Sequence, residues 1–393
     1  MPEMIAPKVL NYASSLEEKT LAQARQTASM PFVHSHIALM PDAHHGLGSA
    51  VGTVIPTLNA VIPAAVGVDI GCGMIAVETH LTASDIAGLD LAALRDSVES
   101  AIPLSPGVYN SGTGRYDFTQ ARLDELTELA ERTGVDLSHS PTWQRQLGSL
   151  GGGNHFIELC LDERDHVWLF LHSGSRGVGN KIAKKHIKIA ERLCKQWWIE
   201  LPTPELAYLP QGTPEFSAYL ADLKWAQKFA LENRGEMMDR FVRAVEHWTG
   251  ADRDSIETDR VNCHHNYTVQ EKHHGKTVWL TRKGAIHAGD GVRGVIPGSM
   301  GTRSYVVRGK GSKAGLDSAP HGAGRRFSRT EARRRFTADD LAARMVGIEY
   351  RHGEAWVDEI PDAYKDIDQV MEDARDLVDV EHTLRQILNV KGT

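Results

Sequence analysis

The chain has 393 residues, of which 41% are hydrophobic and 24% are charged, which is ordinary for a soluble globular protein. Its formal net charge of −7 argues against a protein whose whole surface binds nucleic acid, but it allows a local basic groove. The four cysteines fit no compact disulfide framework, and neither a charged leader nor an apolar run of membrane-spanning length is found. We therefore expect a soluble cytoplasmic protein with no membrane partner.

In the first half of the chain, short apolar runs separated by glycine and proline predict strands at 51–56, 60–68 and 74–79. A helix is expected over 84–102 with Ser84 as its cap, followed by an exposed loop at 105–116 and a helix at 119–132. The apolar run 168–171 predicts a buried strand that places His172 at its end. Functional groups are commonly found at such strand ends.

The middle of the chain is rich in helical patterns, with a long basic helix predicted at 181–198 and one or two helices at 214–248. Strands are predicted again at 277–280, 294–297 and 304–308, and a helical tail at 367–388. Candidate metal ligands are spread from Asp69 to His321, so they can meet only if both halves fold together. We therefore predict an α+β fold, with one composite domain over 1–393 that has mixed β-sheets flanked by helices and an α-helical insertion at about 181–250.

Several residues have the chemistry of metal ligands. Asp69 and Cys72 are separated by a tight glycine turn, and His155, His172 and the pair 264–265 lie in glycine-bounded or turn-like segments. Carboxylate, thiolate and imidazole together favour Mn²⁺, Fe²⁺, Co²⁺ or Zn²⁺ over Mg²⁺ or Ca²⁺. Taken singly, each residue is more simply a buried cysteine or a hydrogen-bonded histidine. Taken together, they indicate a metal centre of one or two ions.

Two glycine-rich segments, 298–301 and 321–325, can expose backbone N–H groups to an anion. His321 directly precedes the second one and Arg325 follows it, so the histidine can act as a nucleophile on phosphorus or as a general acid. The stretch 303–335 contains ten basic residues against Asp317 and Glu331. It can bind phosphates, although a solvated helix face is the usual explanation for such a run.

Across these segments the sequence closely resembles the RtcB-type RNA-splicing ligases, also described as tRNA-splicing ligases. The motifs that carry the resemblance are MPD at 40–42, PAAVGVDIGCGM at 63–74, GNHFIE at 153–158, HSGSRG at 172–177, HHNY at 264–267, IPGSMG at 296–301, HGAGR at 321–325, AYKDID at 363–368 and VKG at 390–392. They follow the order of the family and span nearly the whole chain.

The resemblance implies a GTP- and Mn²⁺-dependent ligase that acts through a guanylylated histidine in tRNA splicing or RNA repair. Its RNA partners would be a 3′-phosphate or 2′,3′-cyclic phosphate end and a 5′-hydroxyl end. By motif, the ligands of two Mn²⁺ ions would be Asp69, Cys72, His155, His172 and His265, and the nucleophile would be His321. His265 is preferred to His264 because the ligand of the family directly precedes asparagine.

The resemblance also implies a pocket for GTP or GMP. Its residues would be Asn154, His155, Phe156, Ile157, Glu158, His265, Asn266, Pro297, Gly298, Ser299, Met300, Ser304, His321, Gly322, Ala323, Gly324 and Lys391. Glu158 can accept hydrogen bonds from the N1–H and 2-amino groups of guanine, and Phe156 can pack on a ring face.

Two positions depart from the family pattern. Pro320 stands where many members have serine or another small residue, and Leu47 stands where a lysine is typical. Two other functions use part of the same residue set. A metal-dependent RNA end phosphohydrolase or cyclic phosphodiesterase would need the metal site but no histidine adduct, and a silent RNA-binding relative would bind without turnover. No protein partner is indicated.

Overall fold

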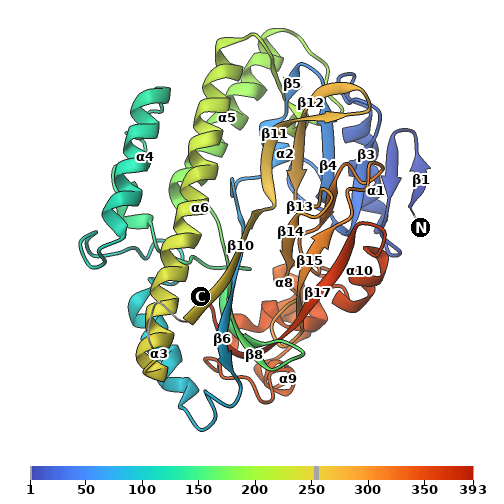
Figure 1. Ribbon diagram of the computed structural model, residues 1–393. Coiled ribbons are helices and arrows are strands. Elements are labelled where there is room, and N and C mark those ends of the chain that lie inside the picture. The colour runs from blue at the N-terminus through green and yellow to red at the C-terminus, as the bar shows by residue number, and fades with distance from the viewer. Residues whose placement is uncertain (1, 252–255, 393) are drawn as a thin grey trace.

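The computed structural model describes residues 2–251 and 256–392, and most of its strands belong to two sheets (Figure 1). The six-stranded sheet has the order β1 (Glu3–Ala6), β2 (Val9–Asn11), β3 (Ile37–His44), β4 (Val51–Thr57), β12 (Lys276–Lys283), β11 (Asn266–His273). The seven-stranded sheet has the order β10 (Glu257–His264), β6 (Gly73–Thr82), β8 (His166–Ser173), β7 (Phe156–Leu161), β17 (Val378–Val390), β15 (Ser304–Gly309), β14 (Arg293–Ile296). Two strand pairs complete the set: β13 (Ala285–His287) with β16 (Ser318–Pro320), and β5 (Ala60–Val61) with β9 (Leu209–Pro210).

Helices lie on both sides of these sheets, with the longest ones together on one side (Figure 1). The helices are α1 (Glu18–Ala28), α2 (Pro63–Val66), α3 (Leu91–Ala101), α4 (Thr119–Thr133), α5 (Arg176–Gln196), α6 (Pro214–Thr249), α8 (Arg329–Arg335), α9 (Ala338–Arg344) and α10 (Ile367–Asp373). Short 3₁₀ turns are η1 (Trp143–Gln146), η2 (Pro204–Leu206), η3 (Glu354–Glu359) and η4 (Pro361–Ala363). Helix α6 packs on β8 and β6 and contacts α3, α4 and α5. The predicted α+β class, with a helical segment in the middle of the chain, is confirmed.

Strand β8 shows why the core has this arrangement. Trp168 and Phe170 belong to one hydrophobic cluster, whereas Leu169 and Leu171 belong to another on the opposite face. Successive side chains of a strand point to opposite faces, so an unbroken apolar run is stable only where both faces are covered. The strand therefore lies centrally, and His172 projects from the face that carries Trp168 and Phe170.

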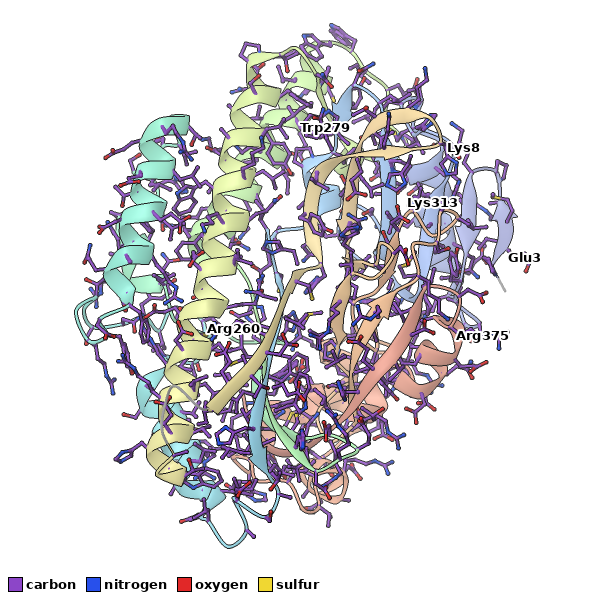
Figure 2. The ribbon with its side chains drawn as sticks, in the orientation of Figure 1. Glu3, Lys8, Arg260, Trp279, Lys313 and Arg375 are labelled. Atoms are coloured by element: carbon purple, nitrogen blue, oxygen red, sulfur yellow. The ribbon has the colours of Figure 1, made fainter. Side chains whose placement is uncertain are left out.

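Two residues labelled in Figure 2 connect the sheets to α6. The Trp279 ring on β12 packs edge-on against Phe216, with 5.4 Å between ring centroids. Arg260 on β10 pairs with Asp239 at 2.8 Å. Within the described residues, no helix combines the length and the apolar character needed to cross a lipid bilayer.

Most predicted elements are confirmed, and 214–248 is one continuous helix. Three predictions are wrong at least in part. The strand predicted at 60–68 stops at Val61, because Pro63 begins α2, where its missing N–H costs nothing. The helix predicted at 84–102 begins only at Leu91, and its cap is Asp90, whose Oδ1 accepts from the N–H of Ala92 at 2.9 Å.

The predicted helical tail at 367–388 is also partly wrong. Its helix ends at Asp373, and the chain continues as β17, which pairs with β15 and β7. The apolar residues of this segment fit a helical period, but pairing with two strands at the centre of a sheet satisfies its backbone groups and buries Leu384 and Leu388 completely.

Candidate active site

The candidate site forms where the chain passes from one main sheet to the other. His265 lies between β10 of the seven-stranded sheet and β11 of the six-stranded sheet. Its N–H donates to the carbonyl oxygen of Cys72 at 2.8 Å, and the N–H of Gly71 donates to that of Asn266 at 2.7 Å. The loop that carries Asp69 and Cys72 is thereby fastened to the junction of the sheets.

Two histidines reach the same place from β7 and β8. Nε2 of His172 lies 3.2 Å from the sulfur of Cys72 and 2.9 Å from Nε2 of His265. His155, directly before β7, has its Nε2 at 3.5 Å from the same sulfur and 3.1 Å from Oδ2 of Asp69. The structure thus brings together all five residues that were predicted to bind metal.

These groups direct lone pairs toward one another. Nδ1 of His155 lies 2.9 Å from the carbonyl oxygen of Leu150, and Nδ1 of His172 lies 3.1 Å from that of Asn154. A carbonyl oxygen only accepts, so each Nδ1 carries the proton and each Nε2 presents a lone pair. The ligand atoms of Cys72, His155 and His172 all lie within 4.8 Å of one another. A divalent cation fits this donor set because it would bind lone pairs that otherwise face each other.

Burial controls the charge of the cluster. It lowers the pKa of His172 and of His265 well below the usual value, and neighbouring histidines lower both further, so both rings are neutral at pH 7. Burial, reinforced by the Asp69 carboxylate, raises the pKa of the Cys72 thiol. Metal binding would therefore have to displace the thiol proton, as it does in other thiolate sites.

Arg234 on α6 supports the cluster from behind and was not predicted from the sequence. Its side chain is fully buried, and Nη1 donates to the carbonyl oxygens of Gly71 at 2.8 Å and Ser173 at 3.2 Å. These residues directly adjoin Cys72 and His172. His264 contacts the same loop, because its Nδ1 lies 2.9 Å from the carbonyl oxygen of Gly71. Its ring therefore lies on the Arg234 side of the loop and not among the metal ligands.

We expect Arg234→Met to lower metal affinity roughly 10–100-fold, the usual effect of removing a group that orients ligands. Arg240→Met is the matched control, because Arg240 is a nearly buried arginine on the same helix whose bonds go to Glu236, Asn110 and backbone oxygens outside the cluster. Isothermal titration with Co²⁺ measures the affinity. Equal affinity in the two variants would show that Arg234 does not position the ligands.

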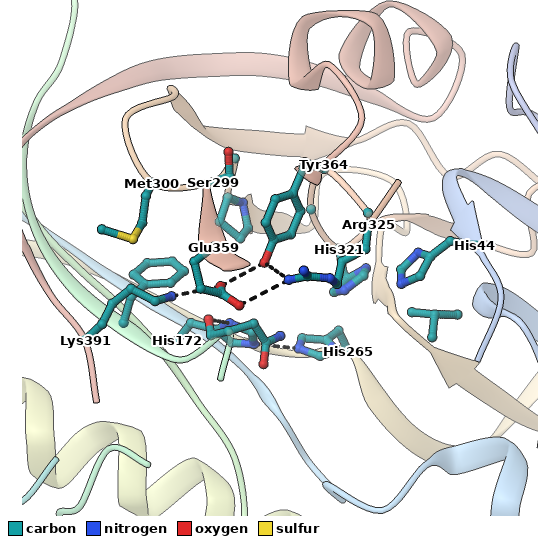
Figure 3. Close-up of a pocket in the computed structure, with 18 of the residues that line it drawn as sticks. His44, His172, His265, Ser299, Met300, His321, Arg325, Glu359, Tyr364 and Lys391 are labelled. Atoms are coloured by element: carbon teal, nitrogen blue, oxygen red, sulfur yellow. Dashed lines mark hydrogen bonds and ion pairs between the residues drawn. The ribbon is translucent and has the colours of Figure 1, made fainter. Parts of the chain in front are cut away.

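His321 lies beside the metal cluster, 4.6 Å from His265 between ring centroids (Figure 3). Its Nδ1 lies 2.6 Å from Oδ2 of Asp42, on β3. The same oxygen accepts from the backbone N–H groups of His321 at 3.1 Å and Gly322 at 3.3 Å. Because a carboxylate only accepts, Nδ1 carries a proton and Nε2 is available as a nucleophile. Asp42 belongs to a motif noted in the sequence, but its partner could not be foreseen.

The two departures from the family pattern have structural counterparts. Pro320 pairs with Ala285 in a two-stranded sheet, and the missing N–H leaves the bond from His321 to Asp42 intact. The second departure is Leu47. Nζ of Lys283, on β12, donates to the carbonyl oxygen of Leu47. Burial lowers the pKa of Lys283 to about 7.

A cavity of about 270 Å³ adjoins His321 (Figure 3). Of the residues predicted for the nucleotide pocket, those lining it are Asn154, Phe156, Glu158, His265, Asn266, Pro297, Gly298, Ser299, Met300, His321, Gly322, Ala323, Gly324 and Lys391. His155 belongs to the metal cluster instead. Ile157 points from β7 into the opposite core, because alternate residues of a strand face opposite sides. The Ser304 hydroxyl accepts from the N–H of Gly298 at 3.3 Å and so supports the lining loop.

Glu158 is almost completely buried in the wall of this cavity, with 2% of its surface exposed. Burial raises its pKa to about 8, although Lys391 and a hydrogen bond from Asn389 act in the other direction. Nδ2 of Asn389 donates to its Oε1 at 2.8 Å. A carboxyl group held neutral at pH 7 among polar groups is typical of a functional site.

A buried ionic network closes another wall of the cavity, as Figure 3 shows. Glu359 accepts from the Tyr364 hydroxyl at 2.8 Å, from Nζ of Lys391 at 3.1 Å, and from Nη1 of Arg325 and Arg329 at 3.1 and 2.5 Å. The network ties the loop after His321 to the C-terminal segment. Glu359 lies in a 3₁₀ turn that has no recognisable pattern, so its role could not be predicted from the sequence.

Comparison with known proteins decides the family. The family model described as tRNA-splicing ligase RtcB matches residues 23–392. The RNA-splicing ligase RtcB of Escherichia coli (strain K12) is 44% identical over 391 residues, which cover 94% of each chain. The chain belongs to the RtcB family. The predicted resemblance and the predicted enzyme class, a ligase of this family, are therefore confirmed.

More distant RtcB proteins match over a similar length. The tRNA-splicing ligase RtcB of Aeropyrum pernix is 30% identical, covering 90% of this chain and 87% of that protein. The corresponding ligase of Thermococcus kodakarensis is also 30% identical, covering 91% of this chain and 87% of its own. The family model, which begins at residue 23, covers the seven-stranded sheet, strands β3, β4, β11 and β12 of the other sheet, and every residue of the candidate site.

Proposed function

We propose that this RtcB-family chain joins RNA 3′-phosphate or 2′,3′-cyclic phosphate ends to 5′-hydroxyl ends, with GTP and Mn²⁺ as cofactors and through a guanylylated His321. The observation that carries the proposal is the position of His321. A carboxylate holds its Nδ1, its ring adjoins the histidine cluster, and a nucleotide-sized cavity opens beside it. One composite domain and a reducing cytoplasm are part of the proposal, since the cysteines are unpaired.

His321 would begin the reaction by attacking the α-phosphorus of GTP through Nε2, forming an N–P bond and expelling pyrophosphate. Asp42 keeps the proton on Nδ1 and stabilises the positive charge that develops on the ring. The N–H groups of Gly322 and His321 are already used by Asp42. The carboxylate therefore fixes both the tautomer of the ring and the course of the loop.

Asp69, Cys72, His155, His172 and His265 would hold the manganese, since their lone pairs converge on one place. Bound there, the metal would supply positive charge that stabilises the phosphates of GTP and of the RNA end. Arg325 also lines the cavity, where it shares the carboxylate of Glu359 with Arg329 and Lys391. The positive charge of this wall would add to that of the metal.

The remaining steps transfer the guanylate and then release it. An oxygen of the RNA 3′-phosphate attacks the guanylyl phosphorus, and Nε2 of His321 leaves. The 5′-hydroxyl oxygen then attacks the activated 3′-phosphate, GMP leaves, and a phosphodiester bond remains. A cyclic phosphate end must first take up water to become a 3′-phosphate. His321 returns to its starting state, so one histidine serves every turnover.

Glu158 leads to a prediction about pH. Its carboxylate form accepts both N–H groups of guanine, whereas the neutral form does not, so its proton must leave before guanine binds. Because the pKa is raised to about 8, we expect GMP affinity without metal to rise roughly fivefold to tenfold from about pH 7 to about pH 8.5. Glu158→Gln should bind GMP more weakly and without this rise. Fluorescence titration measures both proteins, and a variant that kept the rise would exclude Glu158 as the titrating group.

The direct test mixes the protein with GTP, Mn²⁺ and two RNA fragments, one with a 2′,3′-cyclic phosphate and one with a 5′-hydroxyl. We expect a joined product that requires both cofactors, together with a protein adduct that is stable in base and labile in acid. A metal-dependent phosphohydrolase or cyclic phosphodiesterase would change the end phosphate without adduct or joining. That outcome would refute the proposal.

A further inference from the structure

Helix α5 presents an unusually basic surface that the catalytic cavity does not use. Its exposed basic residues are Lys181, Lys184, Lys185, Lys188, Arg192 and Lys195, and its only acidic residue is Glu191. The chain as a whole carries a net charge of −7, so this concentration of positive charge is local. Such a stripe forms an electrostatic footprint for a polyanion.

The charges of this stripe are mostly uncompensated. Lys185 pairs with Asp222 at 2.9 Å. Among the residues that the structure describes, no carboxylate lies within ion-pair distance of Lys184, Lys188, Arg192 or Lys195. The basic residues of α8 differ, because Arg329 and Arg333 pair with Asp358. Free surface cations are better placed to exchange their counterions for phosphates.

The helix also ends in two exposed aromatic residues. The side chains of Trp197 and Trp198 follow its last turn, and Trp198 is 93% exposed. The backbone of Trp198 has φ 55°, a left-handed conformation at which glycine or asparagine is favoured. Neither burial nor backbone preference accounts for a tryptophan there. An indole ring held in water next to a row of cations is suited to stacking on a nucleic-acid base.

The position of α5 connects this surface to the candidate site. Ser175 directly precedes the helix, and its N–H donates to Oδ1 of Asp69 at 2.9 Å. With 21 residues, the helix is about 30 Å long (Figure 1). Trp198 follows its last residue, Gln196, by two positions, so it lies at the end far from Ser175. The basic helix therefore begins directly beside Asp69, one of the proposed metal ligands.

We propose that the exposed face of α5, with Trp197 and Trp198, binds the RNA strand behind the end that enters the active site. This inference rests on the proposed function, which makes RNA the substrate. The lysines and Arg192 contact backbone phosphates, and Trp198 stacks on a base at the far end of the helix, which is about 30 Å long. A membrane is a poorer partner, because the apolar face of α5 packs on α6 and is not free to enter lipid.

The test uses an RNA with a 5′-phosphate and a 3′-hydroxyl, which the proposed reaction cannot join, and measures binding by fluorescence anisotropy without GTP or metal. Lys188→Glu/Arg192→Glu should weaken binding roughly tenfold or more and reduce the slope of log K against log salt by about two. Trp198→Ala should weaken it roughly tenfold with no change in slope. For an RNA that is shorter than the helix, Trp198→Ala and the parent should have equal affinity.

The matched control is Lys272→Glu/Lys276→Glu, which reverses two exposed charges on the β11–β12 hairpin. It should leave RNA affinity within about twofold of the parent. Equal weakening by both double variants would assign the effect to net charge and overturn the proposal. Unchanged RNA binding by the α5 variants would also overturn the proposal. So would a result in which the parent and the control bind phosphatidylserine vesicles and only the α5 variants do not.

Labelling with GTP separates this inference from the proposed function. The α5 variants should form the His321 adduct as the parent does, because they lie outside the nucleotide pocket. If the parent formed no adduct, the proposed function would fail, while anisotropy would still decide whether α5 binds RNA. If the parent formed adduct but the α5 variants bound RNA normally, only the surface assignment would fail.

Discussion

His321→Gln is expected to form no covalent guanylate when the protein is incubated with labelled GTP and Mn²⁺. Glutamine keeps a polar side chain of similar reach, but its amide nitrogen has no lone pair available for attack on phosphorus. Labelled protein is measured after denaturing electrophoresis, and acid treatment identifies the N–P bond. We expect at least a thousandfold loss, on the order of that seen when a covalent nucleophile is removed.

The control for this variant is His80→Gln, which changes an exposed histidine at the end of β6. It should label at the parental rate. Asp42→Asn should label more slowly by roughly 10²–10⁴-fold, because an amide can stabilise the wrong tautomer of the ring. Full labelling of His321→Gln would assign the adduct to another residue and remove the central step of the proposed mechanism.

Cys72→Ala is expected to lower the affinity for Co²⁺, a spectroscopic substitute for Mn²⁺, by roughly 100-fold or more. The sulfur lies 3.2 Å from Nε2 of His172 and 3.5 Å from that of His155, so its loss removes a donor from the middle of the set. The optical transition that a thiolate gives with Co²⁺ should disappear as well. Thermal stabilisation by the metal, about 2.7 kcal/mol at 100 times the Kd, should fall in parallel.

Cys194→Ala is the matched control, because Cys194 is as buried as Cys72 but lies on α5 with its thiol toward the carbonyl oxygen of Tyr208. It should retain the affinity and the optical transition. Since burial raises the pKa of Cys72, Co²⁺ binding should also release a proton in the parent but not in Cys72→Ala. Parental affinity in Cys72→Ala would show that the thiol is not a ligand.

The elements that could be predicted are those whose hydrophobic pattern lies within one segment of the sequence. The unbroken apolar run of β8 and the apolar face of α4 could be recognised without knowing their neighbours, because a short apolar run is typical of a buried strand and a spacing of three to four residues is typical of a helix. The start of α3 was misplaced because Ser84 and Asp90 are both good caps. Only the packing of Leu94 and Val98 selects the second, and Ser84 instead bonds the hydroxyl of Thr82.

The sequence by itself determined the chemistry of this protein: a carboxylate, a thiol and histidines in glycine turns, and His321 before a glycine loop. Tertiary structure alone decided what these groups face. Asp42 meets His321 across 279 residues, Arg234 supports the metal loop from α6, and β17 is a strand because β15 and β7 pair with it. Residue type fixes which bonds a group can make, but the distance between partners far apart in sequence depends on the packing of the whole chain.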